Sequence, residues 1–298
     1  MLLYEEEFLS DLQFSKNYSY NTLSAYKRDL NYYKEFCNHS HKKIKEFYIF
    51  LDKKKLSIRT QARVISCLRS YFKFLQQKGE TCFEMNHLKL PKPSHKLPKV
   101  LQIKDFQALW KVCEEKNVSM SLRNQLVLSF LYGLGCRVSE LIALNVKDVN
   151  QMEAWISVLG KGNKQRHLPL SKNLSQFLGV YLEKSRPYLG NPEKNCLFFN
   201  NRGNRPSRID IWRWLKNWSL KAGLNDIKNP HSFRHGCATE LLDKGANLRS
   251  IQKLLGHSNL QTTQIYTSVS TKKLKSAVEK YHPLSKIKNK NYIFETTK

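Results

Sequence analysis

The sequence lacks several patterns that mark secreted, membrane and zinc-binding proteins. Its 7 cysteines include no CxxC pair, which argues against a disulfide framework and a structural zinc site. We therefore expect reduced, mostly buried thiols. No run of about 18 apolar residues occurs, so we expect no membrane-spanning helix. The first residues, MLLYEEEFLSDL, show no basic segment followed by an apolar core, so we expect a cytoplasmic protein without a signal peptide.

Nucleotide and metal motifs are absent as well. Gly133 and Gly135 resemble the start of a dinucleotide-binding loop, but Val138 stands where the third glycine would be. No GxxxxGK[ST] loop occurs, and no cluster of carboxylates is spaced to hold a metal ion. We expect chemistry that needs neither a metal, nor another cofactor, nor ATP.

Acidic residues are scarce for a chain of this size. The 298 residues contain 51 Lys and Arg against 24 Asp and Glu, a formal net charge of +27. Such an excess costs self-repulsion, which an anionic partner relieves. Nucleic acid is the leading candidate and a membrane surface is the second. Residues 1–90 carry 16 basic and 10 acidic side chains, so residues 91–298 carry the remaining 35 and 14, a net charge of +21.

A change of composition divides the chain in two. Residues 88–101, LKLPKPSHKLPKVL, contain three prolines in eight residues and read as an extended basic linker. Apolar residues recur at helical spacing before it, and Ser19 and Ser57 precede two of the helical runs. We therefore expect a domain of four or five helices over residues 1–87, a linker over 88–101, a second domain over 102–284 and a basic tail over 285–298.

The second domain reads as helical with one small sheet. Residues 121–133 have the apolar character of a buried helix. Residues 154–159 and 165–170 read as two strands joined by the turn GKGNK. The expected fold class is thus mainly α, with a small antiparallel sheet in the second domain.

Residues 231–267 contain polar groups suited to phosphate chemistry at fixed intervals. The segment includes HSFRH at 231–235, LLGH at 254–257 and TTQIYT at 262–267. His231 and Arg234 are three residues apart, so on a helix they face the same side. The guanidinium of arginine matches phosphate oxygens and stays charged at neutral pH. A tyrosine beside such a cluster, here Tyr266, could attack a phosphorus atom.

The same segment resembles the C-terminal signature of the tyrosine recombinase (phage integrase) family, closest to its Xer-type members. LYGLGCRVSELIAL at 131–144 and VLGKGNKQRHLPL at 158–170 resemble the arginine and lysine motifs of that family. Residues 19–30 and 57–75 extend the resemblance into the first third of the chain. It implies an N-terminal SAM-like, core-binding helical domain and a C-terminal catalytic domain.

The resemblance also implies a role for each polar residue. Tyr266 would attack the phosphorus, Arg137, Arg234 and His257 would bind the phosphate, and His231 would accept the tyrosine proton. Lys161, in the hairpin turn, would protonate the leaving 5′ oxygen, and Lys164 is its local rival. Arg137 also has the spacing for an ion pair with Glu140, and in the family an acidic residue at this position supports the arginine. We expect a structural role for His235.

A wider set of basic residues would contact DNA. On sequence grounds these are Lys27, Arg28, Arg59, Arg63, Arg69, Lys73, Lys164 and Arg208. The reaction that the resemblance implies exchanges strands of double-stranded DNA through a 3′-phosphotyrosyl link and a Holliday junction, in a tetramer. An amphipathic helix expected around Leu274–Tyr281 would dock on the neighbouring protomer of that homo- or hetero-tetramer. A second Xer recombinase and a DNA translocase are further expected partners, and the expected location is the nucleoid.

Three other functions fit part of the sequence. An integrase of a phage or mobile element shares the chemistry but often carries an additional arm-binding domain. A catalytically silent DNA-binding accessory protein conflicts with the six filled catalytic positions. A type IB topoisomerase also uses a tyrosine, but it relaxes supercoils as a monomer. The compact length favours the chromosome-dimer-resolving Xer role over an integrase. The extended N-terminal helical region and the segment GHSNLQTTQIYT favour recombination over a topoisomerase.

Overall fold

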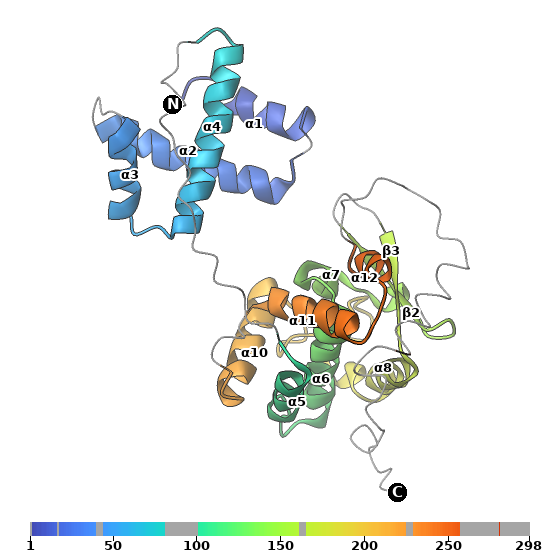
Figure 1. Cartoon of the computed structure of the whole chain (residues 1–298). Helices are drawn as coiled ribbons and strands as arrows, with labels where there is room; N and C mark the ends of the chain where they lie inside the picture. Colours follow the sequence, from blue (N-terminus) through green and yellow to red (C-terminus); the bar gives the residue numbers. More distant parts are fainter. Residues whose placement is uncertain are drawn as a thin grey trace, which may run out of the picture. The chain divides into compact units, whose positions relative to one another are not determined.

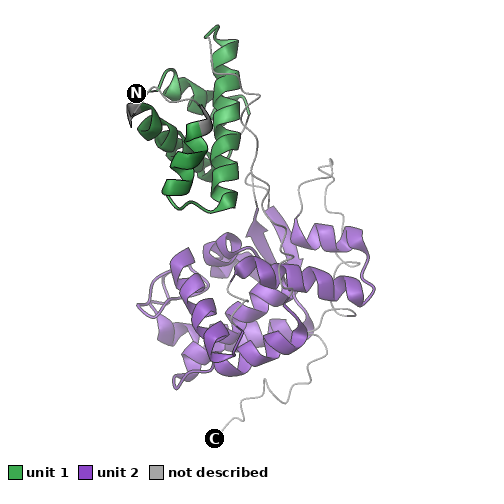
Figure 2. Cartoon of the chain, turned by 60° about the vertical axis from the view of Figure 1, so that its left-hand side comes forward, with its two compact units in different colours: residues 1–97 green, residues 98–298 purple. Residues whose placement is uncertain are grey.

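The chain folds into two compact units, residues 1–97 and 98–298 (Figures 1 and 2). The computed structural model describes residues 2–16, 18–39, 44–80, 101–160, 165–224, 229–256 and 280. Most of the expected linker and all of the expected tail lie outside these ranges, so both stay predictions. The expected amphipathic helix around 274–281 lies there too, apart from residue 280.

Four helices make up the described part of the first unit. They are α1 (Glu5–Phe14), α2 (Tyr20–His39), α3 (Ile44–Lys53) and α4 (Ile58–Gln77). Ser57 caps α4 as expected, because its side chain accepts a hydrogen bond from the backbone N–H of Thr60 at 3.2 Å. The buried faces of the helices meet in one aromatic-rich core that includes Phe8, Phe47 and Tyr71.

A charged residue lies inside this first unit. Asp29, on α2, is fully buried, and its Oδ1 lies 3.1 Å from Nη2 of Arg63 on α4. Neither carboxylate oxygen accepts a well-aligned hydrogen bond from the described residues. Burial raises the pKa of Asp29 to about 6, although the charges of Arg63 and Arg28 act in the opposite direction. The ionised form of Asp29 is therefore costly in the folded state.

Replacing Asp29 with asparagine is expected to stabilise the first unit at pH 7.5. Between its ordinary pKa of 3.8 and its folded pKa of about 6, Asp29 is protonated only in the folded chain. Its favourable contribution is fully present below pH 3.8 and is lost as the pH rises through about 6. Asparagine mimics the protonated form at every pH, so we expect a gain of about 1–3 kcal/mol in the free energy of unfolding at pH 7.5.

Urea unfolding at pH 5 and pH 7.5 measures this difference. All 5 tryptophans lie in the second unit, between Trp110 and Trp218, so their fluorescence is an internal control. Far-UV circular dichroism follows both units. Unfolding of the first unit is seen by circular dichroism but not by tryptophan fluorescence. In the wild-type chain this unit should be less stable at pH 7.5 than at pH 5, and in the Asp29→Asn chain it should not. An equal pH dependence in both chains would show that Asp29 is not the group responsible.

The second unit contains eight α-helices, one 3₁₀ helix and one sheet in its described part. The helices are α5 (Ile103–Val112), α6 (Val118–Gly133), α7 (Val138–Ala143), the 3₁₀ helix η2 (Val146–Asp148), α8 (Lys172–Lys184), α9 (Arg186–Leu189), α10 (Arg208–Lys221), α11 (Pro230–Asp243) and α12 (Leu248–Leu255). With the four helices of the first unit, they confirm the expected mainly α fold.

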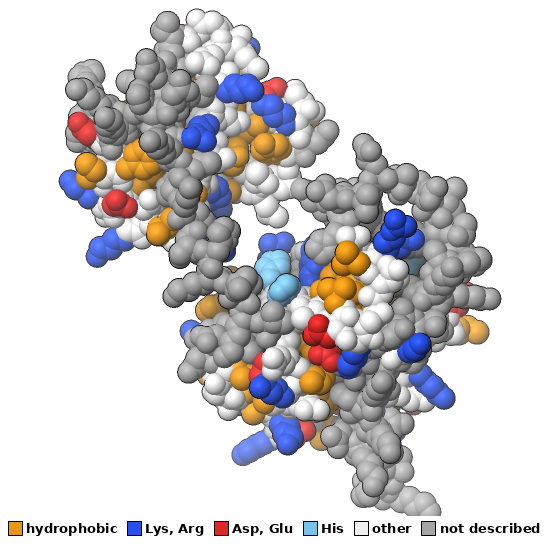
Figure 3. All heavy atoms as spheres, viewed as in Figure 1, with side chains coloured by type: hydrophobic (Ala, Val, Ile, Leu, Met, Phe, Trp, Pro, Cys, Tyr) orange, Lys and Arg blue, Asp and Glu red, His pale blue; other side chains and the backbone are white. Residues whose placement is uncertain are grey.

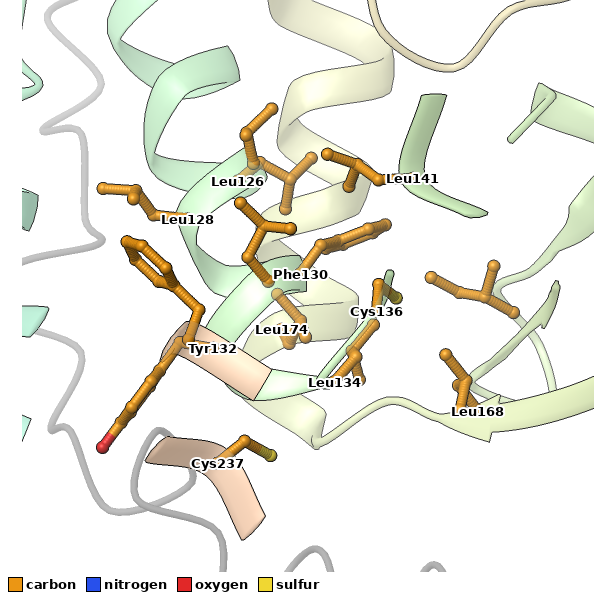
Figure 4. Packing of buried hydrophobic residues seen from close by; sticks show 14 of the residues in the cluster. Leu126, Leu128, Phe130, Tyr132, Leu134, Cys136, Leu141, Leu168, Leu174 and Cys237 are labelled. Carbon is orange, nitrogen blue, oxygen red and sulfur yellow. The ribbon is translucent and has the colours of Figure 1, made fainter. Parts of the chain in front are cut away.

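Helix α6 lies at the centre of the second unit. Every residue from 121 to 133 is buried, and apolar side chains from α7, α8, α11 and β3 surround the helix and the turn after it (Figure 4). The expected buried helix is therefore confirmed, but its start is earlier than expected. Asn117 caps it by accepting a hydrogen bond from the backbone N–H of Met120 at 3.1 Å. Ser121 instead bonds the chain before the helix.

The sheet has three antiparallel strands rather than the two expected. Strands β2 (Trp155–Leu159) and β3 (Gln165–Pro169) form the expected hairpin, and β1 (Val149–Asn150) pairs with the other edge of β2. β1 spans only two residues, too few to show an alternating pattern. Ile156, Val158, Arg166, Leu168 and Pro169 are the buried residues of the two hairpin strands. One of these is an arginine.

The described cysteines agree with the expectation of free, mostly buried thiols. Six are free, five of them are buried, and Cys37 is exposed. Burial raises the pKa of both Cys136 and Cys237 to about 12, so these thiols stay protonated at neutral pH. None of the helices in the described ranges has both the length and the apolar character needed to cross a membrane.

Candidate active site

Four polar residues selected from the sequence line one pocket of the second unit. The pocket has a volume of about 470 Å³, and Arg137, Arg208, His231 and Arg234 all contribute to its wall. They come from the start of α7, the start of α10 and the start of α11. Residues up to 97 positions apart in the sequence are thereby brought together. Trp212, half exposed on α10, adds an aromatic surface.

The start of α7 fixes the backbone of Arg137. Gly135 has a φ of +59°, and a Cβ added there would lie 2.5 Å from the side chain of Leu255. Glycine is therefore required both by conformation and by space. Arg137 precedes the first turn of α7, and its backbone N–H donates to Oε2 of Glu140 at 2.8 Å. The helix start thus holds Arg137 at the edge of the pocket, with its side chain about one third exposed.

Glu140 is buried and is shared by two arginines. Its Oε1 accepts from Nη1 of Arg137 at 2.7 Å, which confirms the expected ion pair. Arg166 of β3 donates to both carboxylate oxygens, at 2.6 and 2.9 Å. Burial acts to raise the pKa of Glu140, but the hydrogen bonds and charges of Arg166 and Arg137 outweigh it and hold that pKa below its ordinary value. Glu140 therefore stays ionised at neutral pH.

The start of α11 places His231 and Arg234 one helical turn apart. The side chain of Asn229 caps the helix by accepting from the backbone N–H of His231 at 3.0 Å, and Pro230 occupies the first turn. His231 is exposed at the pocket, whereas Arg234 is 8% exposed. His235 is exposed and does not line the pocket, and its expected structural role stays a prediction.

Three arginines bind the last three carbonyl oxygens before residue 257. Arg166 Nε donates to Leu254 at 3.3 Å, Arg234 Nη2 donates to Leu255, and Arg137 Nη2 donates to Gly256 at 3.1 Å. The final carbonyls of a helix have no partner within the helix and carry partial negative charge, so they suit cations. The end of α12 is thereby tied to α7, β3 and α11.

Gly256 ends α12. Its φ of +64° places it in the left-handed region, and its backbone N–H donates to the carbonyl of Gln252. A Cβ at this position would lie 3.1 Å from the Arg166 side chain. Glycine at this position therefore lets the end of α12 pack closely against the Arg166 side chain.

The cluster is strongly cationic. Burial, followed by the charges of Arg137 and Arg166, lowers the pKa of Arg234 to about 10. That value still leaves the guanidinium protonated at neutral pH. Three guanidinium groups face the single carboxylate of Glu140, so the cluster keeps a net charge of +2. Such a concentration of positive charge beside a pocket favours an anion, and arginine geometry favours a phosphate.

The remaining basic candidates lie on both units. Lys27 and Arg28 are exposed on α2, Arg59 and Lys73 are exposed on α4, and Arg208 is exposed at the start of α10. Arg63 and Arg69, also on α4, are partly buried. Basic side chains outnumber acidic ones on the face shown in Figure 3. The geometry therefore leaves most of these residues accessible to an anionic partner.

Lys161, Lys164, His257 and Tyr266 lie outside the described residues, so their places and roles stay predictions. Within the described ranges, no three His, Cys, Asp or Glu side chains lie close enough to hold a metal ion. Metal-independent chemistry also stays a prediction.

Sequence reasoning missed Arg166. A signal for it was present, because the expected strand 165–170 gives positions 166, 168 and 170 the same face. Arg166 alternates with Leu168 and Leu170, so the alternation predicts a buried arginine that needs an acidic partner.

Two family models match the chain. Residues 99–273 match the phage integrase family, and residues 6–79 match the N-terminal SAM-like domain of phage integrases. The second match agrees with the helical architecture of the first unit and with the expected SAM-like fold.

Curated relatives and solved structures agree with these matches. The chain is 38% identical over 292 residues to tyrosine recombinase XerD of Staphylococcus epidermidis (strain RP62A), covering 93% of this chain and 98% of the relative. It is 36% identical over 291 residues to tyrosine recombinase XerD of Listeria innocua, with the same coverage.

Two solved structures share the fold at low sequence identity. A XerH site-specific recombinase bound to a palindromic difH substrate aligns with a TM-score of 0.67 at 21% identity, over 92% of this chain and 84% of that one. A lambda integrase dimer bound to a core site aligns with a TM-score of 0.67 at 16% identity, over 88% of this chain and 97% of that one. From these matches and the motifs at the pocket, we conclude that the chain belongs to the phage integrase family of tyrosine recombinases, which are DNA strand-transfer enzymes.

Proposed function

We propose that this chain is a Xer-type site-specific recombinase that resolves chromosome dimers before cell division. The observation that carries the proposal is the single pocket lined by Arg137, His231 and Arg234. Strand transfer on DNA requires a nucleophile, positive charge on the non-bridging phosphate oxygens and a proton for the leaving oxygen. The cationic pocket supplies the second requirement from protein groups.

The proposed reaction begins with attack by the Tyr266 hydroxyl oxygen on the phosphorus of one DNA strand. His231, which lines the same pocket as Arg137 and Arg234, accepts the phenolic proton as a general base. Arg137, Arg234 and His257 stabilise the charge on the phosphate, and Lys161, with Lys164 as its rival, protonates the 5′ oxygen that leaves. The product is a 3′-phosphotyrosyl bond and a free 5′-hydroxyl. The phosphodiester energy is retained in that bond, so religation needs no ATP.

Two domains, over residues 1–87 and 102–284, would each contact the DNA. Lys27, Arg28, Arg59, Arg63, Arg69 and Arg208 are the proposed contacts to phosphates and bases. Exchange of both strands between two duplexes through a Holliday junction needs four protomers. A lambda integrase tetramer bound to such a junction is among the solved structures of similar fold. A second Xer recombinase, a DNA translocase and action on nucleoid DNA in the cytoplasm belong to the same proposal.

Mixing two labelled duplexes that carry a candidate chromosomal recombination site tests this function. We expect four-way junctions, detected by native electrophoresis, from the wild-type chain alone or together with the second Xer recombinase of the same cell. A scrambled duplex should give none. This specificity distinguishes site-specific exchange from strand cleavage at arbitrary positions.

A supercoiled plasmid without the site serves as the second substrate. Relaxation of that plasmid without junction formation would contradict the proposal and indicate a type IB topoisomerase. Tight, site-specific binding without cleavage, even with the second recombinase added, would indicate a catalytically silent accessory protein. Junctions formed only on the attachment sites of a mobile element would indicate an integrase.

A further inference from the structure

We propose that Arg166 is a positioning residue for strand cleavage, acting on Arg137 through the carboxylate of Glu140. The inference rests on the proposed function, because it assumes that Arg137 binds the scissile phosphate. Arg166 does not line the pocket. Its effect would therefore be transmitted through the protein rather than through contact with DNA.

The first support is the place of Arg166 in the sheet. Arg166 faces the interior from β3, pairs across the hairpin with Val158, and has a side chain only 7% exposed. An arginine at an inward strand position costs desolvation unless an acidic partner compensates for it. Glu140 provides that partner through two hydrogen bonds of 2.6 and 2.9 Å. The two planar groups thus meet in the paired geometry that fixes both of them.

The second support is that the Glu140 carboxylate accepts hydrogen bonds from two arginines at once. Glu140 Oε1 accepts from both Arg166 and Arg137, and Oε2 accepts from Arg166 and from the backbone of Arg137. Glu140 holds both the backbone and the guanidinium of Arg137, while Arg166 holds Glu140. Without Arg166, the Glu140 carboxylate could rotate, and Arg137 would be the only arginine of the cluster left to bind it.

The third support is the contact of Arg166 with the end of α12. Its Nε donates to the carbonyl of Leu254, two residues before Gly256, whose own carbonyl accepts from Arg137. The same guanidinium therefore connects β3, the start of α7 and the end of α12. A displacement of about 1 Å in a phosphate-binding group can cost about a hundredfold in rate. Arg166 is placed to prevent such a displacement of Arg137.

Single-turnover cleavage of a nicked duplex that traps the covalent product is the test. In Arg166→Lys, one ammonium replaces a fork that makes three contacts, so we expect cleavage to slow about 10- to 100-fold. DNA affinity, measured by fluorescence anisotropy, should stay within about threefold of wild type, because Arg166 does not line the pocket. The matched control is Arg205→Met, which removes an arginine bound to the other end of α7 at the Ile142 and Leu144 carbonyls. We expect cleavage within about threefold of wild type.

A second comparison separates positioning from folding. Arg166→Met alone leaves Glu140 with one partner and destabilises the chain, whereas Arg166→Met with Glu140→Gln removes both charges and is expected to fold. The double variant should melt near the wild-type temperature and still cleave slowly. Recovery of wild-type cleavage together with folding would overturn the inference, because it would show that Arg166 serves stability alone.

A double-mutant cycle with Arg137→Ala tests whether Arg166 affects cleavage through Arg137. If Arg166 acts through Arg137, Arg166→Lys should slow cleavage by less than about threefold in the Arg137→Ala background. A full 10- to 100-fold effect in that background would show that Arg166 does not act through Arg137. The wild-type chain in the same assay separates this inference from the proposed function. No covalent product from wild type, even with the second Xer recombinase added, would refute the proposed function, whereas wild-type rates in Arg166→Lys would refute only the positioning role.

Discussion

Replacing Tyr266 with phenylalanine is expected to abolish covalent capture of nicked DNA while leaving DNA affinity unchanged. Phenylalanine keeps the aromatic ring and removes only the hydroxyl oxygen that would form the bond to phosphorus. The predicted loss is complete, because no other group in the proposed mechanism can form the same bond. Electrophoresis in denaturant after incubation with a nicked duplex measures the captured fraction.

The control for this prediction is a second tyrosine. Tyr188 is an exposed tyrosine of the same unit that does not line the pocket, so Tyr188→Phe should capture DNA at the wild-type level. Fluorescence anisotropy on the uncut duplex reports affinity for both variants. Capture that persists in Tyr266→Phe would show that a different residue is the nucleophile, and the assignment would fail.

Replacing Arg137 with alanine is expected to slow strand cleavage by about 100- to 1,000-fold. The guanidinium of Arg137 lines the pocket and is one third exposed there, so it can donate to a phosphate oxygen as charge develops. Removing one such donor typically costs about this factor. The variant should fold, because Glu140 keeps both of its hydrogen bonds to Arg166. Single-turnover cleavage at saturating protein concentration gives the rate.

Arg234→Ala is a less selective variant than Arg137→Ala. Arg234 is buried and donates to the carbonyls of Gly135 and Leu255, so alanine leaves buried acceptors without partners.

The matched control for the charge lost in Arg137→Ala is Arg202→Ala, because Arg202 is exposed and lies outside the pocket. Equal rates for Arg137→Ala and Arg202→Ala would contradict a role for Arg137 in the chemistry.

Local sequence signals predicted much of the fold. Ser57 was identified as a helix cap because serine before an apolar helical run satisfies the first backbone N–H groups. Gly256 ends α12 for a comparable local reason, since glycine adopts the left-handed conformation without a steric cost. The start of α6 was misplaced because Ser121 and Asn117 are both good capping residues, and propensity alone does not separate them.

Contacts distant in sequence were harder to predict. Glu140 was expected to pair with Arg137 because the two are three residues apart, but its stronger partner, Arg166, is 26 residues away. The contact between Arg137 and the Gly256 carbonyl spans 119 residues. Neither separation corresponds to a helical or strand period, so only the tertiary fold reveals these contacts. The family motifs, in contrast, identified in advance three of the polar residues that line the pocket: Arg137, His231 and Arg234.

The most direct test of the central claim is to locate the bond between protein and DNA formed in the presence of EDTA. A nicked duplex carrying the recombination site is incubated with the wild-type chain, digested with protease and analysed by mass spectrometry. We predict a nucleotide joined through its 3′-phosphate to Tyr266, with a free 5′-hydroxyl on the released strand. A bond at another residue, a 5′-linked product, or an absolute need for a divalent metal would contradict the mechanism.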